Sequence, residues 1–147
     1  MEIYTIGFTR TTARDFFGRL ADAGVRRLID VRLNNVSQLA GFAKRDDLAF
    51  FLKELCQAEY VHEPRLAPTQ ELLDGLKKHK GAWADYESGF KELLRERRIG
   101  EILTPAFFAG PCVLLCSEAT PEYCHRRLVI EYLQQVWPGA EITPGHL

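Results

Sequence analysis

The fold of this chain is decided by its first stretch, MEIYTIGFTRTTARDFFGRLADAGVRRLIDVR (residues 1–32). The pattern predicts an apolar strand over Glu2–Phe8, a helix that opens at the capping-box motif Thr12-x-x-Asp15 and stops at Gly24, and a second strand over Arg27–Arg32. A strand, a helix and a strand within so short a stretch form a βαβ unit. Such a unit runs its two strands parallel, with a right-handed crossover.

The rest of the chain continues this alternation. The patterns predict a loop over Asn34–Gly41, helices over Asp46–Ala58, Thr69–Lys80, Trp83–Arg98 and Glu122–Val136, and strands over Glu59–His62, Pro111–Ser117 and Ala140–Thr143. Gly89 marks a point where the predicted helix over Trp83–Arg98 could be interrupted. The stretch Ile99–Phe108 fits no single pattern. The expected fold class is therefore α/β: one domain over residues 1–147, with a mostly parallel sheet of about five short strands and helices on both faces.

Composition limits the class of protein. The chain has 147 residues, of which 46% are hydrophobic and 27% charged, and its formal net charge is −1. These values are typical of a globular domain and provide no overall electrostatic attraction to nucleic acid or membranes. No apolar run reaches the roughly 18 residues of a membrane span. Residues 1–7 lack the features of a signal peptide, so we expect a cytoplasmic protein with no membrane partner.

The four cysteines, Cys56, Cys112, Cys116 and Cys124, are then expected to be free thiols. Two of them belong to the stretch Cys116-Ser-Glu-Ala-Thr-Pro-Glu-Tyr-Cys124-His125-Arg126-Arg127, between an apolar strand and an amphipathic helix. Ligand sites of α/β proteins are built at such turns, beyond the carboxyl ends of the strands. We therefore expect the ligand-binding site at this turn. The residues do not indicate which reaction would take place there.

Polar residues also follow or end the other predicted strands, and parallel strands open on one edge of a sheet. We expect one cleft at that edge. Its predicted members are Asp30, Arg32, Cys116, Glu118, His125 or Arg126, and His146.

Thr120 and Pro121 suit the first positions of the last helix, which places Cys124 and His125 in its first turn. The helix dipole and the neighbouring arginines would lower a thiol pKa there. The alternative is that Cys124 and His125 belong to the core, since each begins an apolar row along the helix. Glu118 likewise fits either a partly desolvated acid or base, or a carboxylate at a helix N-terminus.

Asp30 and Arg32 share a strand face. They fit a plain salt bridge, or a pair in which Arg32 binds an anion that Asp30 orients. Residues 77–98 hold seven Lys and Arg against four Asp and Glu, with interleaved aromatic residues. Such a segment could contact nucleic acid, although a solvated helix with internal ion pairs explains it more simply.

Zinc is an obvious candidate for Cys116, Cys124, His125 and His146. Neighbouring helical residues point about 100° apart, which argues against Cys124 and His125 chelating one ion, so no metal ligands are predicted. The sequence leaves the cofactor unknown. The absence of a P-loop and of a dinucleotide-binding glycine motif disfavours an ordinary ATPase or dinucleotide enzyme.

The motifs Thr5-Ile-Gly7, Asp30-Val-Arg32, Cys116-x-Glu118, Cys124-His-Arg126 and His146-Leu147 occur in this order. Together they resemble the bacterial and archaeal family called domain of unknown function 488, nearly end to end. The resemblance implies a compact α/β fold and a site, but no settled activity. A serine often lies in the family's loop after Asp-Val-Arg, and here it is Ser37.

The expected function is an enzyme acting on a small anionic substrate, phosphorylated or nucleotide-like. Its predicted catalytic residues are Cys116, Glu118, Cys124 and His125, and its predicted substrate-binding residues are Asp30, Arg32, Ser37, Arg126 and His146. The alternatives are a non-catalytic nucleotide or nucleic-acid binding module, and a metal- or redox-sensing protein. Replacing Arg32 or Arg126 by Ala is expected to abolish anion binding at little cost in stability, and alkylation to label Cys124 or Cys116 first.

Overall fold

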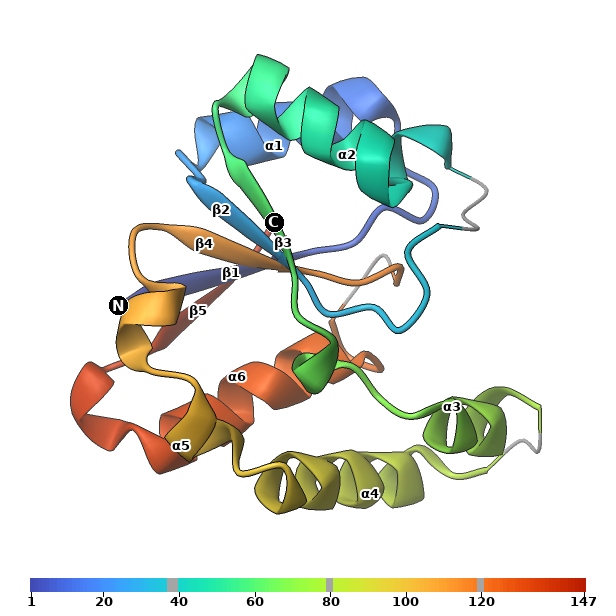
Figure 1. The fold of residues 1–147 in the computed structure, drawn as a ribbon. Coiled ribbons are helices and arrows are strands. Elements are labelled where there is room, and N and C mark those ends of the chain that lie inside the picture. Colours follow the sequence, from blue (N-terminus) through green and yellow to red (C-terminus); the bar gives the residue numbers. More distant parts are fainter. Residues whose placement is uncertain (37–39, 79–80, 119–120) are drawn as a thin grey trace.

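A parallel five-stranded sheet forms the centre of the molecule (Figure 1). The structure is a computed structural model that describes residues 1–36, 40–78, 81–118 and 121–147. The strands are β1 (Glu2–Ile6), β2 (Arg27–Asp30), β3 (Glu59–His62), β4 (Cys112–Leu115) and β5 (Thr143–His146), in the spatial order β3-β2-β4-β1-β5. The α-helices are α1 (Ala13–Asp22), α2 (Arg45–Phe51), α3 (Gln70–Lys77), α4 (Trp83–Glu96), α5 (Ile99–Ile102) and α6 (His125–Val136).

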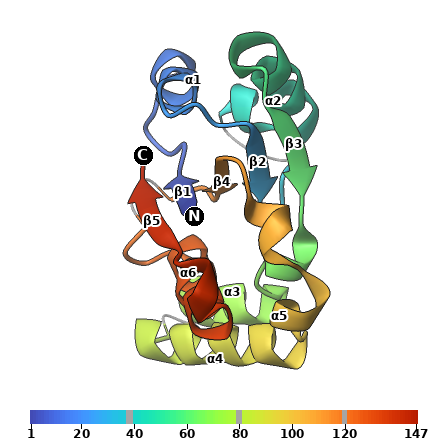
Figure 2. The ribbon, with the colours of Figure 1, turned by 90° about the vertical axis from the view of Figure 1, so that its left-hand side faces the viewer.

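Helices cover both faces of the sheet, which confirms the predicted α/β fold class. Helices α1 and α2 lie over one face, and α6 lies between the other face and α4 (Figures 1 and 2). Helix α3 packs against α4. The alternation along the strands divides the core accordingly. Leu28, Val113 and Leu115 pack on the α1 side, whereas Ile29 and Leu114 pack on the α6 side.

The parallel strands of the first βαβ unit are not neighbours. Strand β4 lies between β1 and β2 and pairs with both. All four residues of β4 are buried, which suits the central position of a parallel sheet. Leu115 is in register with Ile6 of β1 and with Asp30 of β2, so these three strands end at the same level. Gly7, Val31 and Cys116 therefore leave the sheet side by side.

Local signals place several helix ends correctly. Thr12 accepts a hydrogen bond from the Asp15 backbone N–H and caps α1 as predicted. Helix α4 runs through Gly89 without a break. A Cβ atom at Gly89 would lie 2.8 Å from the Leu72 side chain, so this glycine allows α3 to approach α4.

Other boundaries differ from the prediction. The segment after α2 becomes a π-helix over Leu52–Cys56, and the ambiguous stretch holds α5 and a 3-10 turn over Pro105–Phe108. Pro138–Ala140 forms another 3-10 turn, so the last strand starts at Thr143.

Helix α6 begins at His125 and not at Glu122, and its N-cap is Cys124 in an extended conformation, with φ −138° and ψ 140°. Thr120, the predicted cap, lies outside the described residues. Among the helices described, none is long and apolar enough to cross a membrane.

Candidate functional site

A pocket of about 240 Å³ opens at the carboxyl end of β4. Five residues singled out from the sequence line it: Arg32, Cys116, Glu118, Cys124 and His125. Its apolar wall comes from α3 and α4, through Leu73, Leu76 and Tyr86. Segments that are far apart in the sequence thus meet here because β2 and β4 are neighbours in the sheet.

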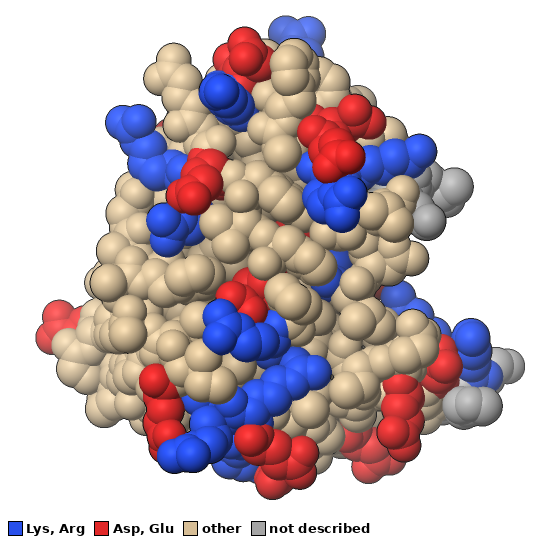
Figure 3. Space-filling model, viewed as in Figure 1, with Lys and Arg blue, Asp and Glu red and all other residues tan. Residues whose placement is uncertain are grey.

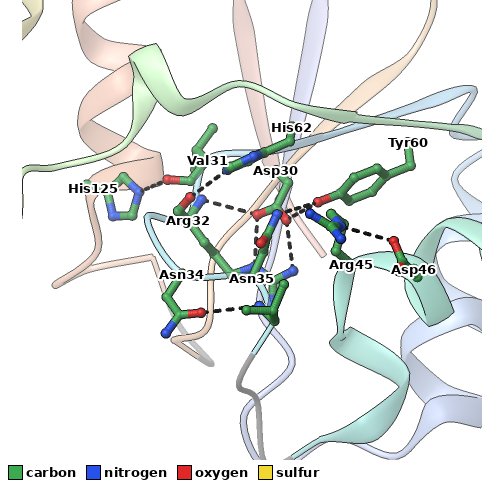
Figure 4. Close-up of polar contacts among 11 residues, drawn as sticks. Asp30, Val31, Arg32, Asn34, Asn35, Arg45, Asp46, Tyr60, His62 and His125 are labelled. Carbon is green, nitrogen blue, oxygen red and sulfur yellow. Dashed lines mark hydrogen bonds and ion pairs between the residues drawn. The ribbon is translucent and has the colours of Figure 1, made fainter.

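The centre of this pocket is a cysteine–histidine pair. The Sγ atom of Cys116 lies 3.6 Å from Nδ1 of His125, and Nε2 of His125 lies 2.6 Å from the backbone oxygen of Val31 (Figure 4). A carbonyl oxygen can only accept a hydrogen bond, so Nε2 carries a proton and donates it. The Val31 carbonyl therefore fixes the imidazole with Nδ1 toward the sulfur. No side-chain pattern points to this carbonyl, and sequence reasoning missed it.

The electrostatics of the pair favour a thiolate at Cys116. The pKa of Cys116 is lowered by a hydrogen bond from the Cys124 thiol, assisted by the charges of His125 and Arg126 against the opposing effect of burial. The pKa of Cys124 is raised in turn by its hydrogen bond to Cys116 and by burial. Burial is the largest single effect and lowers the pKa of His125, but the charge and hydrogen bond of Cys116 and the hydrogen bond to Val31 together outweigh it, so the net shift is upward. Of the two thiols, Cys116 is therefore the one that loses its proton more readily.

The N-cap position of Cys124 changes the geometric argument against a metal site. Because Cys124 has extended and not helical dihedral angles, its side chain is not held at the helical spacing from that of His125. The potential ligand atoms of Cys116, Cys124 and His125 all lie within 4.8 Å of one another. The expectation that Cys124 and His125 point apart was wrong. The predicted core row is also present, since Cys124, Leu128 and Tyr132 are all buried.

Asp30 and Arg32 form a buried ion pair on the α1 side of the sheet. Nε and Nη2 of Arg32 each lie 2.8 Å from an oxygen of Asp30 (Figure 4). The Tyr60 hydroxyl donates to Asp30 over 2.6 Å and accepts from the Asn35 amide. Burial, reinforced by Asp30, raises the pKa of Tyr60. Sequence reasoning missed Tyr60, although its place on β3 beside β2 was predictable.

Arg32 also reaches the pocket. Its guanidinium stacks over the Phe8 ring at 5.3 Å, and its Nη1 atom is buried with no hydrogen-bond partner among the described residues. Arg32 can therefore form the ion pair and bind an anion at the same time, because Nε and Nη2 bind Asp30 while Nη1 has no partner among the described residues.

Arg126 holds the loop between β4 and α6. It is 1% exposed, and its Nη1 donates to the backbone oxygen of Glu118. Gly7 packs against the same point: a Cβ atom there would lie 1.6 Å from the Glu118 oxygen and 2.8 Å from Nη1 of Arg126. Arg126 does not contribute to the described pocket lining. Arg32 and Arg126 are both buried in these contacts, so the reason for expecting little loss of stability on their removal, a position away from buried networks, does not apply.

The remaining predicted site residues lie at the rim of the pocket or outside its described lining. The Glu118 side chain is half exposed, 3.7 Å from Nζ of Lys77, and it precedes α6 by too many residues to be in its first turn. His146 ends β5, and its Nδ1 atom lies 2.6 Å from the Thr5 hydroxyl oxygen. Burial, with the charges of Arg126 and Arg127, lowers the pKa of His146. His146 and Asp30 are at the predicted sheet edge but outside the described pocket lining, and Ser37 lies outside the described residues.

Two described basic residues of the 77–98 segment form ion pairs along α4. Lys91 lies 3.3 Å from Glu87 on the same helix, and Arg95 bonds Glu92 one turn away. On the face in Figure 3, a band of Lys and Arg in the lower part is flanked by Asp and Glu side chains. The arrangement agrees with a solvated, ion-paired helix.

A family model described as "Domain of unknown function DUF488" matches residues 12–133. The chain belongs to the DUF488 family. The match includes the Asp30–Arg32 and Cys116–Arg126 segments, so the residues that line the pocket from β2 and β4 lie within the DUF488 region. No curated protein and no solved structure matches the chain.

Proposed function

We propose that this DUF488 protein is a thiol-dependent enzyme that acts on a small anionic substrate in the pocket at Cys116. The observation that carries the proposal is the Cys116–His125 pair, with Sγ and Nδ1 3.6 Å apart and the imidazole fixed by Val31. A nucleophile within reach of a base that a third group orients is the arrangement of cysteine-dependent covalent catalysis.

Each group has a distinct part in the proposed reaction. Sγ of Cys116 forms a bond to an electrophilic carbon or phosphorus of the substrate, and the leaving group takes the Nδ1 proton of His125 as its bond breaks. A water molecule then attacks the intermediate while Nδ1 accepts its proton, which releases the thiolate. Between turnovers, the Cys124 thiol donates a hydrogen bond to the Cys116 sulfur and so stabilises the thiolate.

The surroundings favour a small substrate with a negative charge. The described lining includes the cationic side chains of Arg32 and Lys77, and Lys77 lies 3.7 Å from the Glu118 carboxylate. The wall of Leu73, Leu76 and Tyr86 accommodates an apolar portion. A volume of about 240 Å³ limits the ligand to a small molecule. Arg32 presents a planar donor suited to a carboxylate or phosphate oxygen.

Turnover in a screen of small carboxylates, phosphomonoesters and nucleotides tests the proposal. We expect a substrate whose turnover falls at least about 100-fold in Cys116→Ser, because activation by a positioned base alone contributes that much. Cys56→Ser, remote from the pocket, serves as the matched control and should keep full activity. Equal activity of Cys116→Ser and the parent would overturn the proposal. Compounds that raise the melting temperature without being converted would instead support a non-catalytic binding module.

A further inference from the structure

We propose that Cys116, Cys124 and His125 also form a three-ligand site for a zinc-class cation, and that the bound ion masks the Cys116 thiol. The metal site is inferred from the positions of the three ligand atoms and does not depend on the proposed enzyme activity. Only its consequence, inhibition of the enzyme, rests on the proposed function.

The spacing of the donor atoms fits a single ion. The three ligand atoms lie within 4.8 Å of one another, and Cys116 Sγ is 3.6 Å from His125 Nδ1. Tetrahedral zinc, with Zn–S near 2.3 Å and Zn–N near 2.0–2.1 Å, requires a sulfur-to-nitrogen separation of about 3.6 Å. The Cys116–His125 separation already has this value, and Cys124 is close enough to complete the group.

The groups behind the ligands are those of a metal-binding histidine. A ligating imidazole usually donates its other N–H to a carbonyl or carboxylate, which orients the ring. His125 donates Nε2–H to the Val31 oxygen at 2.6 Å, and the Phe90 ring packs edge-on against it at 5.3 Å. This orientation presents the unshared pair of Nδ1 toward the two sulfurs once that atom has lost its proton.

The local backbone explains how adjacent residues can share one ion. Cys124 is the extended N-cap of α6 and His125 is its first helical residue, so their side chains are not both held by the helix. All three ligands are buried. Coordination requires both sulfurs as thiolates and Nδ1 without a proton, and the charge of the ion favours these deprotonated forms.

The fourth position faces the pocket. Within the described ranges, the ligand group contains no fourth His, Cys, Asp or Glu side chain, and all three of its members line the pocket. Three protein ligands with an open position differ from closed structural zinc sites, which have four. Water or a small anion would complete the shell, and the ion would occupy the sulfur that the proposed reaction needs.

Cobalt and zinc titration of chelator-treated protein, purified without a metal-affinity step, tests the site. We expect one equivalent of Co²⁺ to produce a thiolate-to-cobalt charge-transfer band, which one equivalent of Zn²⁺ abolishes. Cys124→Ser and His125→Gln should each weaken Zn²⁺ binding at least about tenfold. Cys56→Ser, the matched control, should bind like the parent. Far-UV circular dichroism establishes that each variant is folded, and the parent's cobalt spectrum needs no variant at all.

Iodoacetamide labelling of Cys116 in the same samples separates the two proposals. Zn²⁺ should slow labelling of the parent at least tenfold and leave Cys56 labelling unchanged. Absence of the cobalt–thiolate band, with labelling unaffected by Zn²⁺, would overturn the metal site while the thiol enzyme stands. Stoichiometric Zn²⁺ binding with protection of Cys116, but no substrate that depends on Cys116, would uphold the metal site and overturn the enzyme.

Discussion

The four cysteines occupy different environments, and their reactivities should differ accordingly. Burial raises the pKa of Cys112 to about 12 and raises that of half-buried Cys56. Cys116 is buried but lines the pocket, and its pKa is lowered by the Cys124 thiol and by His125. Since the thiolate is the nucleophile, the position of Cys116 at the pocket and its lowered pKa should make it the most reactive of the four thiols.

We therefore expect a brief iodoacetamide pulse near neutral pH to label Cys116 of metal-free protein first, ahead of Cys56, with Cys124 and Cys112 last. Peptide mapping after the pulse gives the order. Labelling in denaturant, where all four thiols should react alike, is the control. If Cys124 reacts before Cys116 in the folded protein, the assignment of the thiolate is wrong.

Gly7 is a second residue whose role is set by its contacts. Any Cβ atom there would overlap the Glu118 backbone oxygen, at 1.6 Å. Gly7→Ala should lower the free energy of unfolding by about 1–3 kcal/mol or more, the usual cost of overpacking. Urea denaturation followed by circular dichroism measures the change.

Gly18, in the middle of α1, has nothing within 4 Å of the equivalent Cβ position and provides the control. Gly18→Ala should stabilise the protein by up to about 1 kcal/mol, because alanine favours a helix interior. Equal effects of the two substitutions would rule out a special packing role for Gly7.

At the scale of elements, the connection between β4 and α6 depends on one buried side chain. Arg126 extends from the first turn of α6 back to the Glu118 carbonyl, whereas its neighbour Arg127 bonds Glu131 and is partly exposed. The first contact fixes the loop that carries the pocket. The second is an ion pair along the helix surface.

Arg126→Met should therefore lower the free energy of unfolding by about 1–3 kcal/mol, since it leaves a polar group without its partner. Arg127→Met should cost no more than about 1 kcal/mol, as for other partly exposed ion pairs. Thermal or urea unfolding of both variants gives the comparison. A larger loss in Arg127→Met would contradict the assignment of Arg126 as the tether of the loop.

At the scale of the whole molecule, one sheet joins two apolar layers. Strands β1, β2 and β4 contribute side chains to the α1 layer and to the α6 layer. Loss of either layer exposes strands on which the other depends. We expect the two layers to unfold together.

The positions of the tryptophans allow this to be measured. Trp83 and Trp137 both pack against the α6 layer, so their fluorescence reports that side alone. Far-UV circular dichroism reports all helices. Urea midpoints from the two signals should coincide if unfolding is two-state. A fluorescence midpoint clearly below the circular dichroism midpoint would indicate that the α6 layer unfolds independently.

The sequence by itself determined the class of the fold and predicted the segment that lines the pocket. Alternating apolar runs, the Thr12 cap and the turn residues act over a few neighbours, so they are readable without tertiary contacts. They predicted β3 with its bounds and placed Cys116 at the end of a strand. They predicted Arg32, Cys116, Glu118, Cys124 and His125 as site residues, and all five line one pocket.

The tertiary structure decided how those residues act on one another. Strand β4 separates β1 from β2, and only this order brings the Val31 carbonyl to His125. Helix α6 starts at His125, after the predicted start at Glu122, so Cys124 is its N-cap. The Cys124 sulfur lies within 4.8 Å of the Cys116 sulfur, and Arg126 joins the first turn of α6 to the Glu118 carbonyl. These features depend on backbone atoms and on contacts between residues that are far apart in the sequence. They leave no periodic trace in the sequence, because the interacting groups are separated by the length of the chain.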